Sequence, residues 1–291
     1  MTLNSANLFR FEVMNSMSDI ELADNSVFPG ERIFIKRFEH GQFLQFEETI
    51  VSEGRIAVFI NGEETIRLLA LPIEVENLVT GFLLSECFID SFEEVKELSF
   101  NQRSLSVEVT LSQPRQKIQF EPVRSVTSGC GRGVTFVSPL NSSFFPPVTS
   151  ETSLPASKII DLMRKMQRNS PLFSQTGGVH SAAVANGSEI LYAADDIGRH
   201  NAVDKVLGWM LRSCYSTDND LNKVSILATT GRLSSEIVTK AVRGRFPFLI
   251  SPSAPTLGAV QLGEALGVTI IGFARGQRFN VYTHPDRVIS P

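Results

Sequence analysis

The chain has 291 residues, of which 42% are hydrophobic and 20% are charged, an ordinary composition for a globular protein with room for two modest domains. Its formal net charge of -4 argues against a broad basic face for nucleic acid, although a local basic pocket is compatible with it. No apolar run approaches the ~20 residues of a membrane-spanning helix, and three scattered cysteines do not suggest a disulfide framework. Because the N-terminus also lacks the pattern of a signal peptide, we expect a cytoplasmic protein with no membrane or nucleic-acid partner.

The first 112 residues predict a flexible extension followed by a small β-rich domain. Residues 1–32 are polar and weakly patterned, which is typical of a loosely attached extension. A strand region is predicted at 33–46, with a possible bend at His40-Gly41. Further strands are predicted at 56–60, 66–71, 96–100 and 105–111, with a turn at Asn61-Gly62 and one helix at about 74–85. Residues 33–112 are therefore expected to form a β-roll wrapped on one helix.

Residues 113–155 break this pattern and contain the most reactive candidate side chain. Their prolines, serines and glycines predict a long mobile connection. Cys130 lies in it between Gly129 and Gly131, so its sulfur is expected to be sterically open. The nearest cations, Arg124 and Arg132, would lower the pKa of this thiol and increase the thiolate fraction. The alternative is an exposed loop cysteine without a function.

Residues 156–291 alternate between helical and strand patterns. Helices are predicted at 156–167, 202–211, 234–242 and 257–266. Strands are predicted at 179–185, from 190 onwards, and at 224–228, 246–250 and 268–273, with a hairpin turn at Asn186-Gly187. Such alternation predicts a layered α/β sheet, in a chain that is α+β overall.

A dense polar cluster lies where the second strand of that hairpin meets the following helix. Two interpretations stay open. Asp195 and Asp196 suit the positive end of the helix dipole without any ligand. Arg199 and His200, next to free backbone N–H groups, would instead suit an anion such as phosphate.

Three other places carry candidate binding residues. His180 either ends a strand or contacts a ligand, and Arg232 precedes an apparent helix-capping sequence but could still reach a pocket. Arg275 and Arg278 surround Gly276-Gln277 after a buried strand. Two guanidinium groups there suit phosphate oxygens, although a basic β-turn would look the same.

Several blocks of the chain together resemble the FdhD/NarQ family of formate dehydrogenase accessory proteins, from about residue 34 to the C-terminus. The blocks are TGGVHSAAV, DDIGRHNAVDKVLG, GRLSSEIVTKA, SPSAPTLGAVQLGEALGVTIIGFARG and VYTHPDR. The resemblance implies a cytidine deaminase-like α/β fold for the C-terminal domain. It also implies a sulfur carrier that takes sulfur from a cysteine desulfurase as a persulfide on Cys130. The sulfur would pass to the molybdenum cofactor, in its bis(molybdopterin guanine dinucleotide) form, before that cofactor enters formate dehydrogenase.

The resemblance also implies the cofactor-binding residues. It assigns this role to the segment Phe273, Ala274, Arg275, Gly276, Gln277 and Arg278. The other candidates, Arg199, His200, His180 and Arg232, are expected to line the same cleft. A homodimer is a further possibility.

The chain departs from the family at two cysteine positions. The usual pattern is Cys-Gly-x-Cys-Gly, and here Cys130 is kept while Gly133 replaces the second cysteine. This loss favours an alternative function, a cofactor-binding chaperone without sulfur transfer. At Cys87 the family more often has glycine, and we interpret Cys87 as a small buried thiol.

Two enzyme classes fit poorly. A zinc deaminase needs His-x-Glu and Cys-x-x-Cys elements, which the chain lacks, so no zinc is expected. A nucleotide-hydrolysing enzyme has no support either, because no pairing of nucleophile and base is evident.

Overall fold

The computed structural model describes residues 29–113, 145–168, 170–216 and 224–290, and the following account concerns these ranges. A six-stranded sheet forms the centre of the C-terminal half, with the order β13-β12-β11-β10-β8-β9. The strands β10, β11 and β12 are parallel, whereas β8, β9 and β13 pair antiparallel to their neighbours. Their bounds are β8 His180–Asn186, β9 Glu189–Asp196, β10 Ile226–Thr229, β11 Phe248–Ile250, β12 Thr269–Arg275 and β13 Arg278–Val281. The predicted α/β class, α+β overall, is confirmed.

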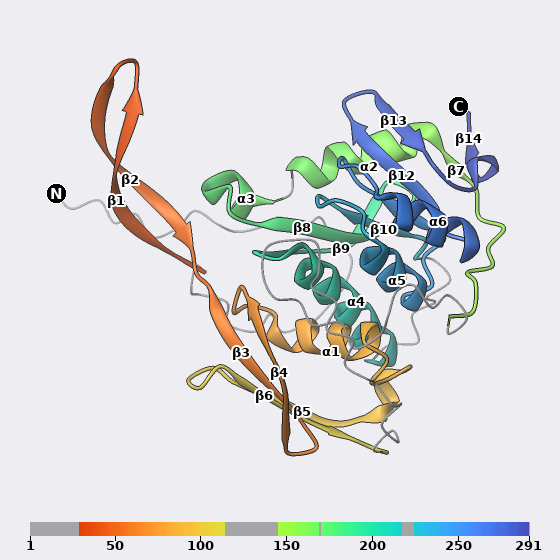
Figure 1. The fold of residues 1–291 in the computed structure, drawn as a ribbon, viewed down its shortest axis with the longest axis horizontal. Helices are drawn as coiled ribbons and strands as arrows, with labels where there is room; N and C mark the ends of the chain where they lie inside the picture. Colours follow the sequence, from red (N-terminus) through yellow and green to blue (C-terminus); the bar gives the residue numbers. More distant parts are fainter. Residues whose placement is uncertain (1–28, 114–144, 169, 217–223, 291) are drawn as a thin grey trace.

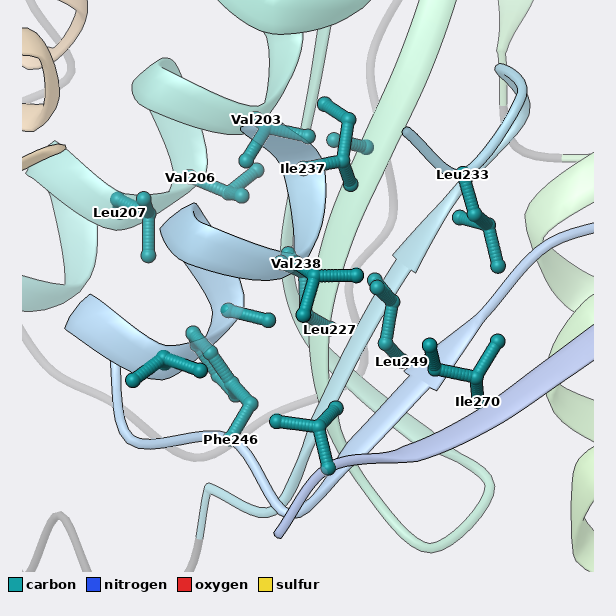
Figure 2. Close-up of a cluster of buried hydrophobic side chains, with 14 of the residues drawn as sticks. Val203, Val206, Leu207, Leu227, Leu233, Ile237, Val238, Phe246, Leu249 and Ile270 are labelled. Carbon is teal, nitrogen blue, oxygen red and sulfur yellow. The ribbon is translucent and has the colours of Figure 1, made fainter. Parts of the chain in front are cut away.

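Helices cover both faces of this sheet (Figure 1). The helix α2 (Ala156–Arg168) packs on one face, and α4 (Arg199–Ser216), α5 (Ser235–Arg243) and α6 (Leu257–Ala265) pack on the other. Strand alternation divides the side chains between two cores: Ala182 and Val184 face α4, while Ala183 and Ala185 face α2. Figure 2 shows the larger core, in which aliphatic side chains of α4 and α5 meet Leu227, Leu249 and Ile270 of the sheet.

The N-terminal half contains a four-stranded sheet with the order β4-β3-β6-β5. Its elements are β3 Gly54–Ile60, β4 Glu63–Ala70, β5 Val95–Asn101 and β6 Ser106–Leu111, with the helix α1 Val75–Ser85 and a short 3-10 helix at Phe92–Glu94. The four predicted strands and the helix are confirmed within a few residues. Aliphatic residues of β3, β6 and α1 form a separate core.

The predicted strand region at 33–46 is a complete hairpin. Its strands are β1 (Gly30–Glu39) and β2 (Gln42–Val51), and the predicted bend at His40-Gly41 is its tight turn, with φ values of 50° and 83°. The two strands form a sheet of their own and extend away from the body of the molecule (Figure 1). The hairpin is therefore a projecting arm and not a strand of the four-stranded sheet.

Several smaller elements have no counterpart in the sequence prediction. They are α3 (Pro171–Thr176), β13, a 3-10 turn at Pro285–Arg287, and the two-residue strands β7 (Leu154–Pro155) and β14 (Val288–Ile289), which pair with each other. Phe145 and Val148, near the end of the predicted 113–155 connection, are buried in the larger core. Residues 1–28 and 114–144, with Cys130 among them, lie outside the described residues.

Cys87 adopts a backbone conformation that glycine favours. It follows the C-terminus of α1 with a φ of 62°, in the left-handed region that glycine adopts at no steric cost. Its side chain is half-buried and packs against the larger core. The prediction of a small buried thiol holds only in part, because Cys87 contacts the core but is half-buried and not fully buried. None of the helices in the described ranges has the length and hydrophobicity needed to span a bilayer.

The two halves meet where α1 crosses α4 at very close range. A Cβ atom at Gly81 would lie 1.8 Å from the backbone oxygen of Asp204, and one at Gly208 would lie 1.9 Å from the backbone oxygen of Asn77. Each helix therefore has glycine where the backbone of the other passes. A short approach of this kind fixes the position of α1 on the C-terminal layer.

We predict that Gly208→Ala destabilises the protein, although alanine is the better helix former by about 1 kcal/mol. The added methyl group overlaps backbone atoms of α1, and overpacking of this type costs about 1–3 kcal/mol or more. Urea denaturation of the two proteins measures the difference. Gly258→Ala is the matched control, because its Cβ would meet only the Ser235 hydroxyl, which can rotate away. An equal or higher stability of Gly208→Ala would contradict the close crossing.

Candidate functional site

The candidate binding residues lie along one edge of the six-stranded sheet. This edge is formed by the C-terminal ends of β10, β11 and β12, and by the start of β8 and the end of β9. His180 opens β8, Asp196 closes β9, and Arg275 closes β12. In open α/β sheets, ligands bind outside the carboxyl ends of the parallel strands, so the edge is the expected position for a site.

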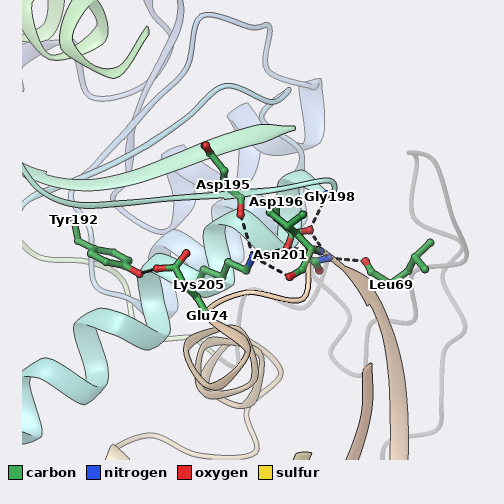
Figure 3. Close-up of polar contacts among 9 residues, drawn as sticks. Leu69, Glu74, Tyr192, Asp195, Asp196, Gly198, Asn201 and Lys205 are labelled. Atoms are coloured by element: carbon green, nitrogen blue, oxygen red, sulfur yellow. Dashed lines mark hydrogen bonds and ion pairs between the residues drawn. The ribbon is translucent and has the colours of Figure 1, made fainter. Parts of the chain in front are cut away.

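Asp196, in the polar cluster, has a structural role. Its carboxylate and the ammonium group of Lys205 form a 2.8 Å ion pair in which both side chains are fully buried. The carboxylate also accepts hydrogen bonds from the backbone N–H groups of Leu71 and Gly198 and from the Asn201 amide. Figure 3 shows this network joining the end of β9 to the chain that leaves β4. The contacts of Asp196 are therefore explained by its structural role, and they require no ligand.

Lys205 was missed by sequence reasoning, although a signal was present. It interrupts the apolar stripe formed by Val203, Val206 and Leu207 on α4. A lysine inside such a stripe must be paired when it is buried. Its Nζ also donates to the backbone oxygens of Leu71 and Asp195, which satisfies its remaining donors.

A second polar group is built around the candidate residues His180, Arg199 and His200. It remains partly open to solvent. His200, in the first turn of α4, lies 3.1 Å from the Glu236 carboxylate of α5, measured from its Nε2 atom. The Ser234 hydroxyl donates to the same carboxylate. The sequence suggested a capping box here. Ser234 does occupy the N-cap position, but its side chain does not cap the helix, because it bonds to Glu236 instead.

His180 and Arg199 complete this group. Thr230 Oγ1, in the loop after β10, lies 3.5 Å from His180 Nδ1 and accepts a hydrogen bond from the backbone N–H of Ser181. Arg199 packs against Gly231, where a Cβ atom would lie 2.8 Å from two carbons of the arginine side chain. Glycine is therefore needed at position 231 to make room for Arg199. Arg232, on the same loop, is exposed.

The electrostatics of this group keep both histidines neutral near pH 7. Burial lowers the pKa of His180, and the positive charge of Arg199, together with that of His200 when it is protonated, lowers it further. Burial also lowers the pKa of His200, against the opposing effect of its hydrogen bond to Glu236. That bond lowers the pKa of Glu236, so Glu236 is a carboxylate and accepts the hydrogen bond from the N–H group at Nε2 of His200. His200 therefore contributes a hydrogen-bonding ring, and Arg199 supplies the lasting positive charge.

Arg275 and Arg278 lie further along the edge, in the hairpin between β12 and β13. The register shifts between Gly272 and Arg275, and Phe273 has a φ of 52°, which is uncommon for a bulky residue. The backbone N–H groups of Phe273 and Ala274 donate to the loop that follows β11. This irregular segment is therefore tied down, and strained backbone of this kind is concentrated at binding sites.

A small hollow lies beside these two arginines. Its volume is about 70 Å³, and it is formed between α2 and the β12–β13 hairpin. Its lining combines apolar side chains with three arginines; the lining residues are Ile159, Ile160, Met163, Arg164, Gln167, Ala274, Arg275, Gly276, Arg278 and Phe279. Gly276 and Gln277 form the exposed turn of the hairpin.

The candidate binding residues therefore form two separate groups on one edge of the six-stranded sheet. His180, Arg199 and His200 come together as expected, on the side covered by α4 and α5. The hollow with Arg275 and Arg278 lies on the side of α2, and Arg199 and His200 are not among its lining residues. The strands β8 and β12 are three strand spacings, or roughly 14 Å, apart in the sheet, and the two groups also lie on opposite faces of it. Within the described ranges, no three metal-binding side chains cluster in a way that could hold an ion.

Comparison with known proteins shows which family the chain belongs to. The family model described as FdhD/NarQ matches residues 51–289, which is most of the chain. The chain belongs to the FdhD/NarQ family. The match contains every predicted site residue, and the edge of the six-stranded sheet is thus part of the region that the family model spans.

Individual relatives match along nearly their whole length. The chain is 36% identical over 253 residues to the sulfur carrier protein FdhD of Bacillus subtilis, covering 87% of this chain and 95% of the relative. It is 34% identical over 266 residues to the protein of the same name from Staphylococcus haemolyticus, covering 91% and 98%. A crystal structure of a putative formate dehydrogenase accessory protein from Desulfotalea psychrophila superposes with a TM-score of 0.72 at 25% identity, covering 89% of this chain and 99% of that one.

Proposed function

We propose that this chain is a sulfur carrier for the maturation of formate dehydrogenase, and that it acts on the molybdenum cofactor in its bis(molybdopterin guanine dinucleotide) form. The proposal is supported by full-length relatives named as sulfur carriers and by a structural neighbour named as a formate dehydrogenase accessory protein. The observation that carries it in this chain is the pair of arginines on the strained hairpin at the sheet edge.

The arginine pair suits the phosphate groups of a nucleotide. Arg275 and Arg278 are opposite each other in the β12–β13 register, so both guanidinium groups leave the same hairpin end. Arg164 of α2 contributes to the same hollow. Guanidinium groups bind phosphate oxygens through two parallel hydrogen bonds, and the exposure of both hairpin arginines leaves them accessible to a ligand.

The dimensions of the edge favour a long ligand. A hollow of about 70 Å³ is far below the ~300–1,000 Å³ that encloses a drug-sized molecule, so it can hold only one part of the cofactor. The group with Arg199, His180 and His200 offers a second cation and two hydrogen-bonding rings, on strands that lie roughly 14 Å from β12 across the sheet. A ligand with a guanine nucleotide at each end of a central pterin pair is long enough to reach both groups.

The proposed sulfur transfer has two steps, loading of Cys130 and release of the sulfur. The loading step needs no added oxidant or reductant. The Cys130 thiolate attacks the terminal sulfur of a persulfide on the cysteine desulfurase. The sulfur–sulfur bond of the donor breaks, a new one forms on Sγ of Cys130, and the donor cysteine leaves as a thiolate.

Release of that sulfur as sulfide requires two electrons. A thiol that attacks Sγ of Cys130 supplies them, because sulfide leaves and a disulfide to Cys130 remains. In the paired-cysteine pattern that the family usually has, the second cysteine is placed for this attack. Here position 133 is glycine, so the attacking thiol must come from another molecule. The chain, the desulfurase and formate dehydrogenase are proposed to meet in the cytoplasm.

The same substitution supports one alternative function. A chaperone that binds the cofactor without transferring sulfur would need the arginines of the edge but no cysteine pair. Gly133 is the observation that favours it. A sulfur carrier and a chaperone would both use the same cofactor site. Only the sulfur carrier would need Cys130.

We predict that GDP, the end piece of the cofactor, binds at the hairpin and that Arg275→Ala and Arg278→Ala each weaken it about tenfold or more. Loss of one charged hydrogen bond to phosphate costs about 1.5–3 kcal/mol, and 1.4 kcal/mol corresponds to a factor of ten. Isothermal titration calorimetry measures the affinities. Arg103→Ala changes an exposed arginine in the turn between β5 and β6, and this control should bind GDP as the parent does. Unchanged binding by both hairpin variants would place the cofactor elsewhere.

We also predict that Cys130→Ala abolishes the maturation of formate dehydrogenase, whereas the control Cys87→Ala retains it, because Cys87 is packed against the core. The measurement is formate oxidation by dehydrogenase produced in cells that contain each variant in place of the parent protein. GDP affinity of Cys130→Ala should equal that of the parent. Full maturation with Cys130→Ala would reject the sulfur carrier and support the chaperone.

A further inference from the structure

The loop that follows β11, residues 251–256, is bonded to both groups of candidate binding residues. In the sheet order, β11 lies between β10 and β12, so this loop leaves the edge between the loop after β10 and the β12–β13 hairpin. The loop after β10 contacts His180 and Arg199, and the hairpin carries Arg275. A ligand that reaches from one group to the other must therefore cross the loop after β11.

Two serines of this loop bind the group with the histidines through their side chains. The Ser251 hydroxyl donates a hydrogen bond to the backbone oxygen of Gly231 at 2.7 Å. The Ser253 hydroxyl donates one to the backbone oxygen of Thr230 at 3.0 Å. Both acceptors belong to that group, since the glycine makes room for Arg199 and the threonine contacts a histidine ring.

The same two serines bind the hairpin through their backbones. The backbone N–H of Ala274 donates to the backbone oxygen of Ser251 at 3.0 Å, and that of Phe273 donates to the backbone oxygen of Ser253 at 3.1 Å. These donors lie in the irregular part of β12 that leads directly into Arg275. Each serine thus contacts one group with its hydroxyl and the other group with its carbonyl.

The loop itself is held firmly and carries no charge. Ser251 is fully buried, and its hydroxyl oxygen also accepts a hydrogen bond from the backbone N–H of Ser253. Backbone hydrogen bonds join Leu233 to the residues on both sides of Pro255, and the two prolines of the loop restrict its backbone further. Residues 252–255 are partly exposed and include no charged side chain. An anionic ligand that crosses the loop therefore meets a rigid, neutral surface.

We infer that Ser251 and Ser253 are positioning residues, which hold the two groups at one fixed separation so that both nucleotide ends of a single ligand bind at the same time. This inference rests on the proposed function, because the two nucleotide ends are those of the cofactor. Once one end is bound, the other end binds at a high effective concentration, but only if the geometry allows both sites to be occupied. A rigid spacer keeps that geometry without a loss of conformational freedom on binding.

Isothermal titration calorimetry with two probes tests the inference. GDP has one nucleotide end, whereas diguanosine tetraphosphate has two ends on a chain that can span the roughly 14 Å between β8 and β12. The parent should bind the two-ended probe about a hundredfold or more tightly than GDP. The double variant Ser251→Ala/Ser253→Ala should reduce this ratio to about tenfold or less, because the ends are no longer held at a matching distance. Its affinity for GDP should stay within about threefold of the parent, since the hairpin keeps its backbone hydrogen bonds.

Thr256→Ala is the matched control for a purely structural effect. The Thr256 side chain caps α6 by accepting a hydrogen bond from the backbone N–H of Ala259, and it contacts neither group. Its loss weakens the same loop and helix start, yet the ratio of the two affinities should equal that of the parent. Circular dichroism verifies that each variant is folded. If the double variant does not fold, Ser253→Ala replaces it, because the Ser253 side chain is only partly buried and its loss should still lower the ratio.

The outcomes separate this inference from the proposed function. A folded serine variant with the same ratio of affinities as the parent would overturn the positioning role. A parent that binds GDP at the hairpin, but binds diguanosine tetraphosphate no more tightly, would also overturn it and would leave the proposed cofactor site intact. A parent that does not bind GDP would overturn the proposed site, and the inference would fail with it.

Discussion

The buried ion pair between Asp196 and Lys205 determines how the two halves of this protein are joined. Asp196 ends β9, Lys205 lies in the second turn of α4, and both bind backbone atoms of Leu71 where the chain leaves β4. Removal of one member of a fully buried pair costs about 3–5 kcal/mol, because the remaining charge is left without a partner. The pair therefore holds the end of β9, the start of α4 and the connection to α1 in one arrangement, and the glycines of α1 and α4 allow the two helices to cross closely beside it.

This frame also sets the position of the functional groups. Arg199 and His200 lie in the first turn of the helix that Lys205 anchors, and His180 lies opposite Asp196 in the register of β8 and β9. Neither histidine is free to rearrange, because Glu236 and Thr230 contact their rings. At the other end of the edge, the hairpin with Arg275 is fixed by backbone hydrogen bonds to the loop after β11. A long anionic ligand would thus meet two rigid groups that lie on opposite sides of one sheet edge.

Local sequence signals predicted most of the fold, and they failed where the deciding contact is distant in the chain. The turns at Asn61-Gly62 and Asn186-Gly187 and the alternation of strands with helices depend on neighbouring residues, and all were predicted correctly. Asp196 could not be assigned from the sequence, because its backbone donor at Leu71 is 125 positions away. His180, Arg199 and His200 lie together, but they do not line the hollow beside Arg275, with which they were expected to share one cleft. The placement of Arg275 on the α2 side depends on a β-bulge that no local pattern revealed.

The central claim is that Cys130 carries sulfur even though position 133 is glycine. The most direct measurement is intact-protein and peptide mass spectrometry after incubation of the pure chain with a cysteine desulfurase and cysteine. The account predicts the addition of one sulfur atom to the peptide that contains Cys130. The adduct should disappear on treatment with a reducing thiol, and the peptide with Cys87 should stay unmodified. An unmodified Cys130 in a chain that still binds GDP would contradict the sulfur carrier and leave the cofactor-binding chaperone.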